Sequence, residues 1–133
     1  MLKFITAYAA TALVFLGVDF VWLSRLATRF YSENLGHLLM ERPNLAAAGA
    51  FYAFFAVGIV FFAVAPALKT ESLGTAILSG ALFGFFAYAT YDVTNYATLR
   101  DWPVVVVAVD VAWGTFLSAI SAAAGYGVAR VVS

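Results

Sequence analysis

The chain has 133 residues, of which 65% are hydrophobic and only 11% are charged. Soluble domains contain about 45–50% apolar and about 25% charged residues, so this composition excludes a water-soluble surface and predicts a protein whose solvent is lipid. The formal net charge is zero, which gives no indication of a nucleic-acid partner, and the absence of cysteine excludes disulfides and thiolate chemistry.

Four stretches are long enough to cross a bilayer, which takes about 20 mostly apolar residues in a helix. They are residues 4–23, 45–68, 73–97 and 103–128. The connections 69–72 and 98–102 are too short to hold a domain, so neighbouring helices must be antiparallel. We therefore predict an all-α membrane protein, a four-transmembrane-helix bundle forming a single domain over residues 1–133.

The connection between the first and second spans, residues 24–44, is longer and more polar than the others. Six charged or titratable side chains alternate there with leucines and a phenylalanine at helical spacing. This pattern is too polar to span a membrane and is typical of an amphipathic segment that lies on the membrane surface. A solvated connector is the alternative interpretation.

Basic residues are nearly balanced between the two ends of the predicted bundle. The connector end, which holds residues 24–44 and 98–102, carries four arginines, and the terminal end, which holds both termini and residues 69–72, carries two lysines and one arginine. The positive-inside rule therefore favours the connector end in the cytoplasm only weakly, and orientation and dual topology stay open.

Three acids, Asp19, Asp92 and Asp110, lie inside the predicted spans. A charged side chain at the centre of a spanning helix costs about 2.5–3.5 kcal/mol on insertion scales, so such residues are functional candidates. With a rise of 1.5 Å per residue, Asp19 lies about 9 Å, and the other two about 12 Å, from the connector end. All three acids therefore share one half of the bilayer.

Other polar and aromatic side chains lie at the same depth. Tyr88, Asp92 and Asn95 follow a helical spacing that places them on one face of the third span. We predict a polar, aromatic-walled pocket that opens towards the connector end, with residues 24–44 able to cover it. The predicted site residues are Asp19, Asp92, Asp110, Asn95, Tyr88, Tyr52, Trp113 and Trp22.

A structural interpretation of the acids stands beside this one. Intramembrane Asp, Asn and Tyr side chains can simply hydrogen-bond helices together, at about 0.6 kcal/mol per contact on average. In addition, Asp19 is close enough along the chain to pair with Arg25 or Arg29.

The tryptophans have two interpretations as well. Trp22 and Trp102 fall where an aromatic belt meets the membrane interface, whereas Trp113 lies too deep for that role. The string Asp-x-x-Trp occurs at residues 19–22 and again at 110–113. We do not interpret it as a repeat, because the two helices run in opposite directions, which points Trp22 towards the surface and Trp113 towards the midplane.

Gly80 and Gly84 form a Gly-x-x-x-Gly motif in the third span. The motif permits close helix packing, within the chain or against a second copy in a homo-oligomer. The sequence has no zinc-binding, phosphate-loop or Ser–His–Asp pattern. Three carboxylates and an asparagine could hold a hard cation, but their spacing is not that of a calcium loop, so we predict no metal site and leave any cofactor undetermined.

Five strings of the sequence are distinctive, namely GVDFVWL, FYSENLGHLL, RPNLAAAGAFY, YATYDVTNYATLRDWP and DVAWGTFLSA. In these strings the chain resembles the DUF2177 family of predicted bacterial membrane proteins, and the resemblance runs over nearly the whole chain. It implies four spans, a bacterial source and therefore a multi-pass location in the bacterial inner membrane. The function of the family is unknown, so the resemblance implies no activity.

Three functions compete on these observations. We favour a binding or transport module whose carboxylates bind a proton, a cation or a small amphiphilic or lipid ligand drawn from the bilayer. One alternative is an intramembrane enzyme that uses paired carboxylates as acid and base on a lipid or isoprenoid. The other is a structural subunit of a larger membrane complex.

Overall fold

The computed structural model describes residues 1–133, and helices are its only regular elements. They are α1 (Leu2–Val21), α2 (Thr28–Leu35), α3 (Leu45–Ile59), α4 (Ala65–Thr70), α5 (Leu73–Thr98) and α6 (Val104–Val132). Two π-helical stretches, Trp22–Leu26 and Val60–Val64, extend α1 and join α3 to α4 without a break. Four continuous rods, Leu2–Leu26, Leu45–Thr70, Leu73–Thr98 and Val104–Val132, are long and apolar enough to cross a membrane.

The predicted fold class is therefore confirmed, and the protein is a multi-pass membrane protein. The first and fourth rods run a few residues past their predicted ends, to Leu26 and Val132.

The residues before three of the helices explain where those helices begin. The Asn44 side chain accepts a hydrogen bond from the Ala47 N–H at 3.0 Å, and Ser72 caps α5 in the same way. Pro103 precedes α6, where its missing N–H leaves no intrahelical bond unmade.

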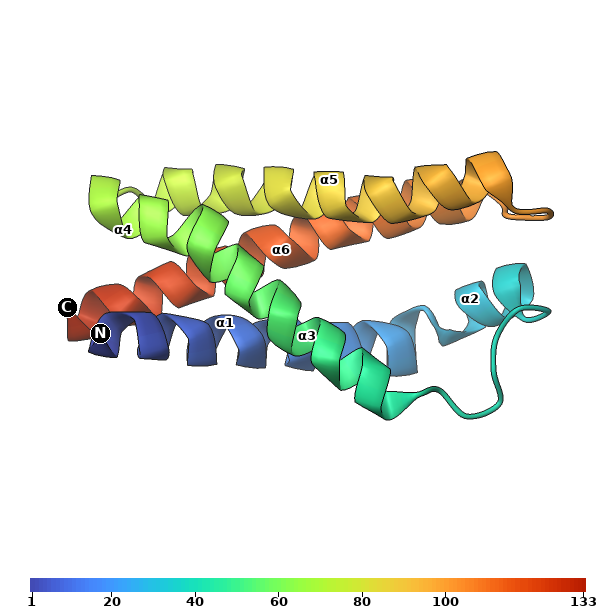
Figure 1. Cartoon of the computed structure of the whole chain (residues 1–133), viewed down its shortest axis with the longest axis horizontal. Helices are drawn as coiled ribbons and strands as arrows, with labels where there is room; N and C mark the ends of the chain where they lie inside the picture. Colours follow the sequence, from blue (N-terminus) through green and yellow to red (C-terminus); the bar gives the residue numbers. More distant parts are fainter.

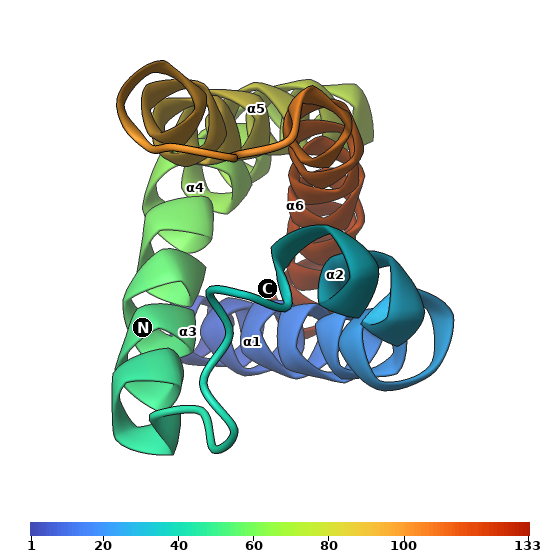
Figure 2. The ribbon, with the colours of Figure 1, turned by 90° about the vertical axis from the view of Figure 1, so that its right-hand side faces the viewer.

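The four rods form a bundle in which α6 packs most extensively against α5 and next against α1 (Figure 1). The rod that starts with α3 crosses the bundle obliquely. Its first part packs on α1, and its later, π-helical part packs on α5. As a result, the distance between α3 and α5 increases towards the connector end (Figures 1 and 2).

Small residues explain the tight contact between α5 and α6. A Cβ atom on Gly80 would lie 2.7 Å from the Ala122 Cβ, and one on Gly84 would overlap the Gly114 carbonyl and the Ser118 side chain. Both glycines are buried. The Gly-x-x-x-Gly motif thus packs helices within the chain.

The segment 24–44 lies at the connector end of the bundle. Figure 2 views the molecule from this end, with α2 in front of α1 and α6 and the loop that follows it running across to the start of α3. Leu35 of α2 is buried in a small cluster with Trp102 and Val106, and Phe30 and Tyr31 pack against it. Some apolar side chains of the predicted amphipathic segment therefore contact protein, whereas Leu26, Leu38 and Leu39 are exposed.

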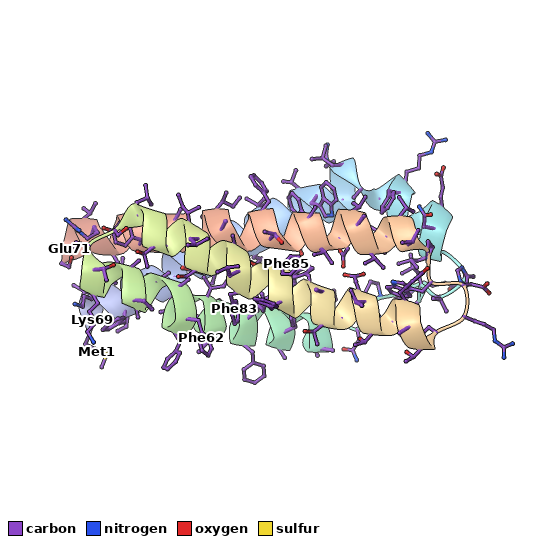
Figure 3. The ribbon with its side chains drawn as sticks, turned by 90° about the horizontal axis from the view of Figure 1, so that it is seen from above. Met1, Phe62, Lys69, Glu71, Phe83 and Phe85 are labelled. Carbon is purple, nitrogen blue, oxygen red and sulfur yellow. The ribbon has the colours of Figure 1, made fainter.

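Both termini lie at one end of the molecule (Figure 1), and Figure 3 shows Met1, Lys69 and Glu71 together at that end. An ion pair between Arg130 and Glu71, with 3.6 Å between Nη1 and Oε1, ties α6 to the turn before α5 there.

This topology is testable with single cysteines, because the natural chain has none. In sealed vesicles, a membrane-impermeant maleimide is expected to label Lys3→Cys and Ser133→Cys from the same side, and Arg100→Cys from the other. Each variant is compared before and after the vesicles are opened with detergent. Labelling of the two terminal positions from opposite sides would rule out the four-span arrangement.

Candidate binding site

A cavity of about 520 Å³ lies at the connector end of the bundle. Two acids, Asp19 and Asp110, line it, and no lysine, arginine or histidine does. Its remaining walls are mostly aromatic or aliphatic. They consist of Trp22, Leu23, Thr28, Tyr31, Ser32, Leu35, Leu39, Pro43, Tyr88, Tyr91, Trp102, Val106 and Trp113.

Asp19 is held by two hydrogen-bond donors from other helices. The Tyr52 hydroxyl of α3 donates to Asp19 Oδ2 at 2.5 Å, and the Trp113 indole N–H of α6 donates to Oδ1 at 2.9 Å. The carboxylate of α1 is only 7% exposed. Each oxygen therefore has a partner, and neither partner carries a positive charge. The alternative pairing of Asp19 with Arg25 or Arg29 does not occur, since the ion pairs of the molecule are Arg29–Glu33 and Arg130–Glu71.

Asp110 accepts a hydrogen bond from α2, the short helix at the connector end of the cavity. The Tyr31 hydroxyl of α2 donates to Asp110 Oδ1 at 2.8 Å, and the Trp22 indole N–H donates to the same hydroxyl at 3.3 Å. Burial, together with the neighbouring Asp110, raises the pKa of Tyr31 above its ordinary value. The hydroxyl consequently stays protonated and remains a donor. Trp22 begins the π-helical stretch that extends α1, a geometry often found at functional sites.

In each of the two Asp-x-x-Trp segments, the tryptophan interacts with the aspartate of the other segment. Because α1 and α6 are antiparallel, Trp113 reaches Asp19 directly and Trp22 reaches Asp110 through Tyr31. The two indole rings stack between them, with centroids 4.2 Å apart and planes 9° from parallel. Trp22 therefore turns into the cavity, and the sequence-based expectation that it points to the membrane surface is wrong.

Asp92 does not line the cavity but adjoins Asp110, which does. It is 0% exposed, and neither of its oxygens has a hydrogen-bond partner. The Asp110 carboxylate and the Trp102 indole are polar neighbours of its side chain. The Trp102 N–H is also without a hydrogen-bond partner.

The structure brings most of the predicted site residues together. Asp19, Trp22, Tyr88, Asp110 and Trp113 line the cavity, Tyr52 holds Asp19, and Asp92 adjoins Asp110. Asn95 is the exception, since it lies beside Tyr91 and lines neither this cavity nor the one described below. The three acids do not gather closely enough to hold a metal ion between them.

Three lining aromatics were missed in the sequence. The sequence places Trp102 in the interface belt, but Trp102 is only 8% exposed because Leu35 of α2 packs against it. Tyr31 lay inside the segment assigned to the surface, although its spacing of one helical turn from Leu35 matches their shared inward face. Tyr91 adjoins Asp92 in the chain and offered no periodic signal of its own.

A second cavity, of about 340 Å³, lies where α3 and α5 diverge. Phe51 and Phe55 form one wall of it, and Ala87 is part of the other. It shares three lining residues with the first cavity, namely Tyr88, Tyr91 and Asp110. The first cavity therefore adjoins a cavity between two spanning helices.

Comparison with known proteins places this arrangement in a family. Residues 4–127 match the family described as predicted membrane protein (DUF2177). The chain belongs to the DUF2177 family. The matched region includes the second and third rods, the first rod from residue 4, the fourth rod up to residue 127, and every residue that lines the two cavities. No curated protein and no solved structure matches this DUF2177 chain.

Proposed function

We propose that this DUF2177 protein binds a hydrophobic organic cation inside the membrane, in the cavity between Asp19 and Asp110. The observation that carries the proposal is the charge of the cavity wall, which has two acids and no basic residue. A buried carboxylate is costly in lipid unless an opposite charge or a proton compensates it. A cationic ligand supplies that compensation.

The aromatic wall favours a particular kind of cation. Tryptophan and tyrosine faces attract cations, and cages of such rings are a recurring solution for quaternary ammonium groups. Here Trp22 and Trp113 present a stacked pair, and Tyr88 and Tyr91 lie on the facing helix. A volume of about 520 Å³ lies within the usual range for small-molecule sites.

The second cavity supports access from the bilayer. It lies between α3 and α5 and shares Tyr88, Tyr91 and Asp110 with the first cavity. A ligand with an apolar body and a cationic group could move from the acyl-chain region past Phe51 and Phe55 to the acids. This path favours an amphiphilic cation over a fully hydrated inorganic one, which would have to shed its water.

The proposal is tested by calorimetric titration of the purified protein in neutral detergent with benzyltrimethylammonium. Asp110→Asn is expected to weaken binding at least tenfold. A tenfold loss of affinity corresponds to about 1.4 kcal/mol, which is a modest share of the attraction between opposite charges in contact. Neopentylbenzene, in which carbon replaces the charged nitrogen, is expected to bind far more weakly than the cation. Asp101→Asn is the matched control, since Asp101 is exposed in the loop before α6.

The pH dependence has a defined sign. Binding is expected to weaken as the pH falls, because protonation of the acids removes the charge that attracts the cation. Equal affinity for the cation and its uncharged analogue, or unchanged affinity in Asp110→Asn, would refute the proposal.

A further inference from the structure

We infer that Asp92 and Asp110 hold one proton between them and form a proton-binding site that adjoins the ligand cavity. Asp110 belongs to both sites, because it lines the cavity and also lies next to Asp92. The second half of the inference, that a bound cation displaces this proton, rests on the proposed function.

The surroundings of Asp92 carry the first half. Its side chain is 0% exposed, and both oxygens lack a hydrogen-bond partner. The two ion pairs of the molecule, Arg29–Glu33 and Arg130–Glu71, involve other residues. A fully buried carboxylate without a donor or a counter-ion is among the most unfavourable groups in a membrane.

The neighbours of Asp92 leave one way to relieve this cost. The titratable groups that act on it are Asp110 from α6 and Tyr91 from its own helix, and neither is a cation. Trp102 contributes a neutral indole whose N–H makes no hydrogen bond. Two adjacent carboxylates cannot both be charged here at low cost, so one proton is retained by the pair and donated from one acid to the other.

A shared proton couples the two sites. When Asp92 carries the proton, Asp110 is the charged member, and it accepts hydrogen bonds from Asp92 on one side and from Tyr31 on the other. A cation that approaches Asp110 stabilises the fully ionised pair and therefore favours release of the proton. Conversely, protonation of the pair weakens cation binding, as linkage requires.

Two measurements test the inference, and the first needs no ligand. At neutral pH, the infrared C=O band of a protonated carboxylic acid is expected in the folded wild-type protein, absent in Asp92→Asn, and retained in the control Asp101→Asn. The amide introduced by Asp92→Asn can donate to Asp110 in place of the acid, so the variant is expected to keep the wild-type melting temperature. If it does not fold, the same band is followed in Asp110→Asn, where its frequency is expected to shift because the acceptor has changed.

The second measurement is proton release on addition of benzyltrimethylammonium to weakly buffered protein. Wild type is expected to release up to one proton for each cation bound, and Asp92→Asn to bind the cation while releasing none. A wild type that binds no cation defeats the proposed function but leaves the infrared result to decide the proton site. A band that is missing from wild type, or that persists unchanged in both Asp92→Asn and Asp110→Asn, overturns the proton site.

Discussion

Replacement of Gly84 by leucine is expected to destabilise the protein by at least about 2 kcal/mol, within the range found for overpacked cores. Gly84 is buried in α5, and even a Cβ atom there would overlap the Gly114 carbonyl of α6 and the Ser118 side chain. A backbone carbonyl cannot rotate away as the end of a flexible side chain can. The leucine must therefore push α5 and α6 apart along the most extensive helix contact of the bundle.

The measurement is thermal unfolding in detergent, followed by circular dichroism, with size-exclusion chromatography to detect aggregation. Gly127→Leu is the matched control, because Gly127 is exposed on α6 and a Cβ atom there meets nothing within 4 Å. The control is expected to melt like the wild type. Equal melting temperatures for Gly84→Leu and Gly127→Leu would show that the contact between α5 and α6 does not depend on close approach.

The four spans could be predicted because the bilayer imposes both a length and a composition on each helix. The depth of the three acids could be predicted for a related reason, since a helix rises by a constant 1.5 Å per residue. Asp19 and Asp110 were thereby assigned to one level of the membrane, and they do line one cavity.

Rotation about each helix axis could not be predicted in the same way. A span that is apolar all round has no hydrophobic stripe to show which face is inward, so the inward face of α1 could be argued only from Asp19. The reciprocal contacts of Trp22 and Trp113 depend on that rotation and on the antiparallel packing of α1 with α6. The opposite directions of the two helices, which argued against a repeat, are what bring the indole rings together.

The position of α2 at the mouth of the cavity was still harder to predict from the sequence. The position of α2 depends on a loop that crosses the end of the bundle, and no sequence period encodes such a return. The polar residues of 24–44 are typical of a membrane-surface segment, while Tyr31 and Leu35 contact Asp110, Trp102 and Val106. A short helix can have one face towards water or headgroups and the other towards a protein cavity, and composition alone does not separate these cases.

Replacement of Asp19 by leucine is expected to destabilise the protein, whereas replacement by asparagine is expected to leave it folded and close to wild-type stability. Leucine removes the acceptor of two hydrogen bonds and leaves the Tyr52 hydroxyl and the Trp113 N–H unpaired. An unpaired buried donor costs about 1–3 kcal/mol in soluble proteins, and less in membranes, where hydrogen bonds average about 0.6 kcal/mol. Tyr52 and Trp113 are partly buried, which lowers the cost further. We expect a total loss of about 1–3 kcal/mol.

Asparagine is different because the two donors are not equivalent. The Trp113 indole can only donate, and the amide oxygen introduced by Asp19→Asn can accept from it. The Tyr52 hydroxyl can also accept, so it can rotate to receive a hydrogen bond from the amide NH₂. Asp19→Asn thus keeps both contacts while removing the negative charge, which separates the structural contribution of this residue from its electrostatic one.

The two variants therefore discriminate between the interpretations of the intramembrane acids. Thermal unfolding is expected to rank Asp19→Leu below Asp19→Asn, and Asp19→Asn beside wild type and the exposed control Asp101→Asn. Titration with benzyltrimethylammonium is expected to show weakened binding in Asp19→Asn but not in Asp101→Asn. If Asp19→Asn melts as low as Asp19→Leu, the charge itself holds α1, α3 and α6 together, and Asp19 is a packing residue. If Asp19→Asn is stable and still binds the cation as wild type does, the charge at this position serves neither role, and Asp110 alone must attract the ligand.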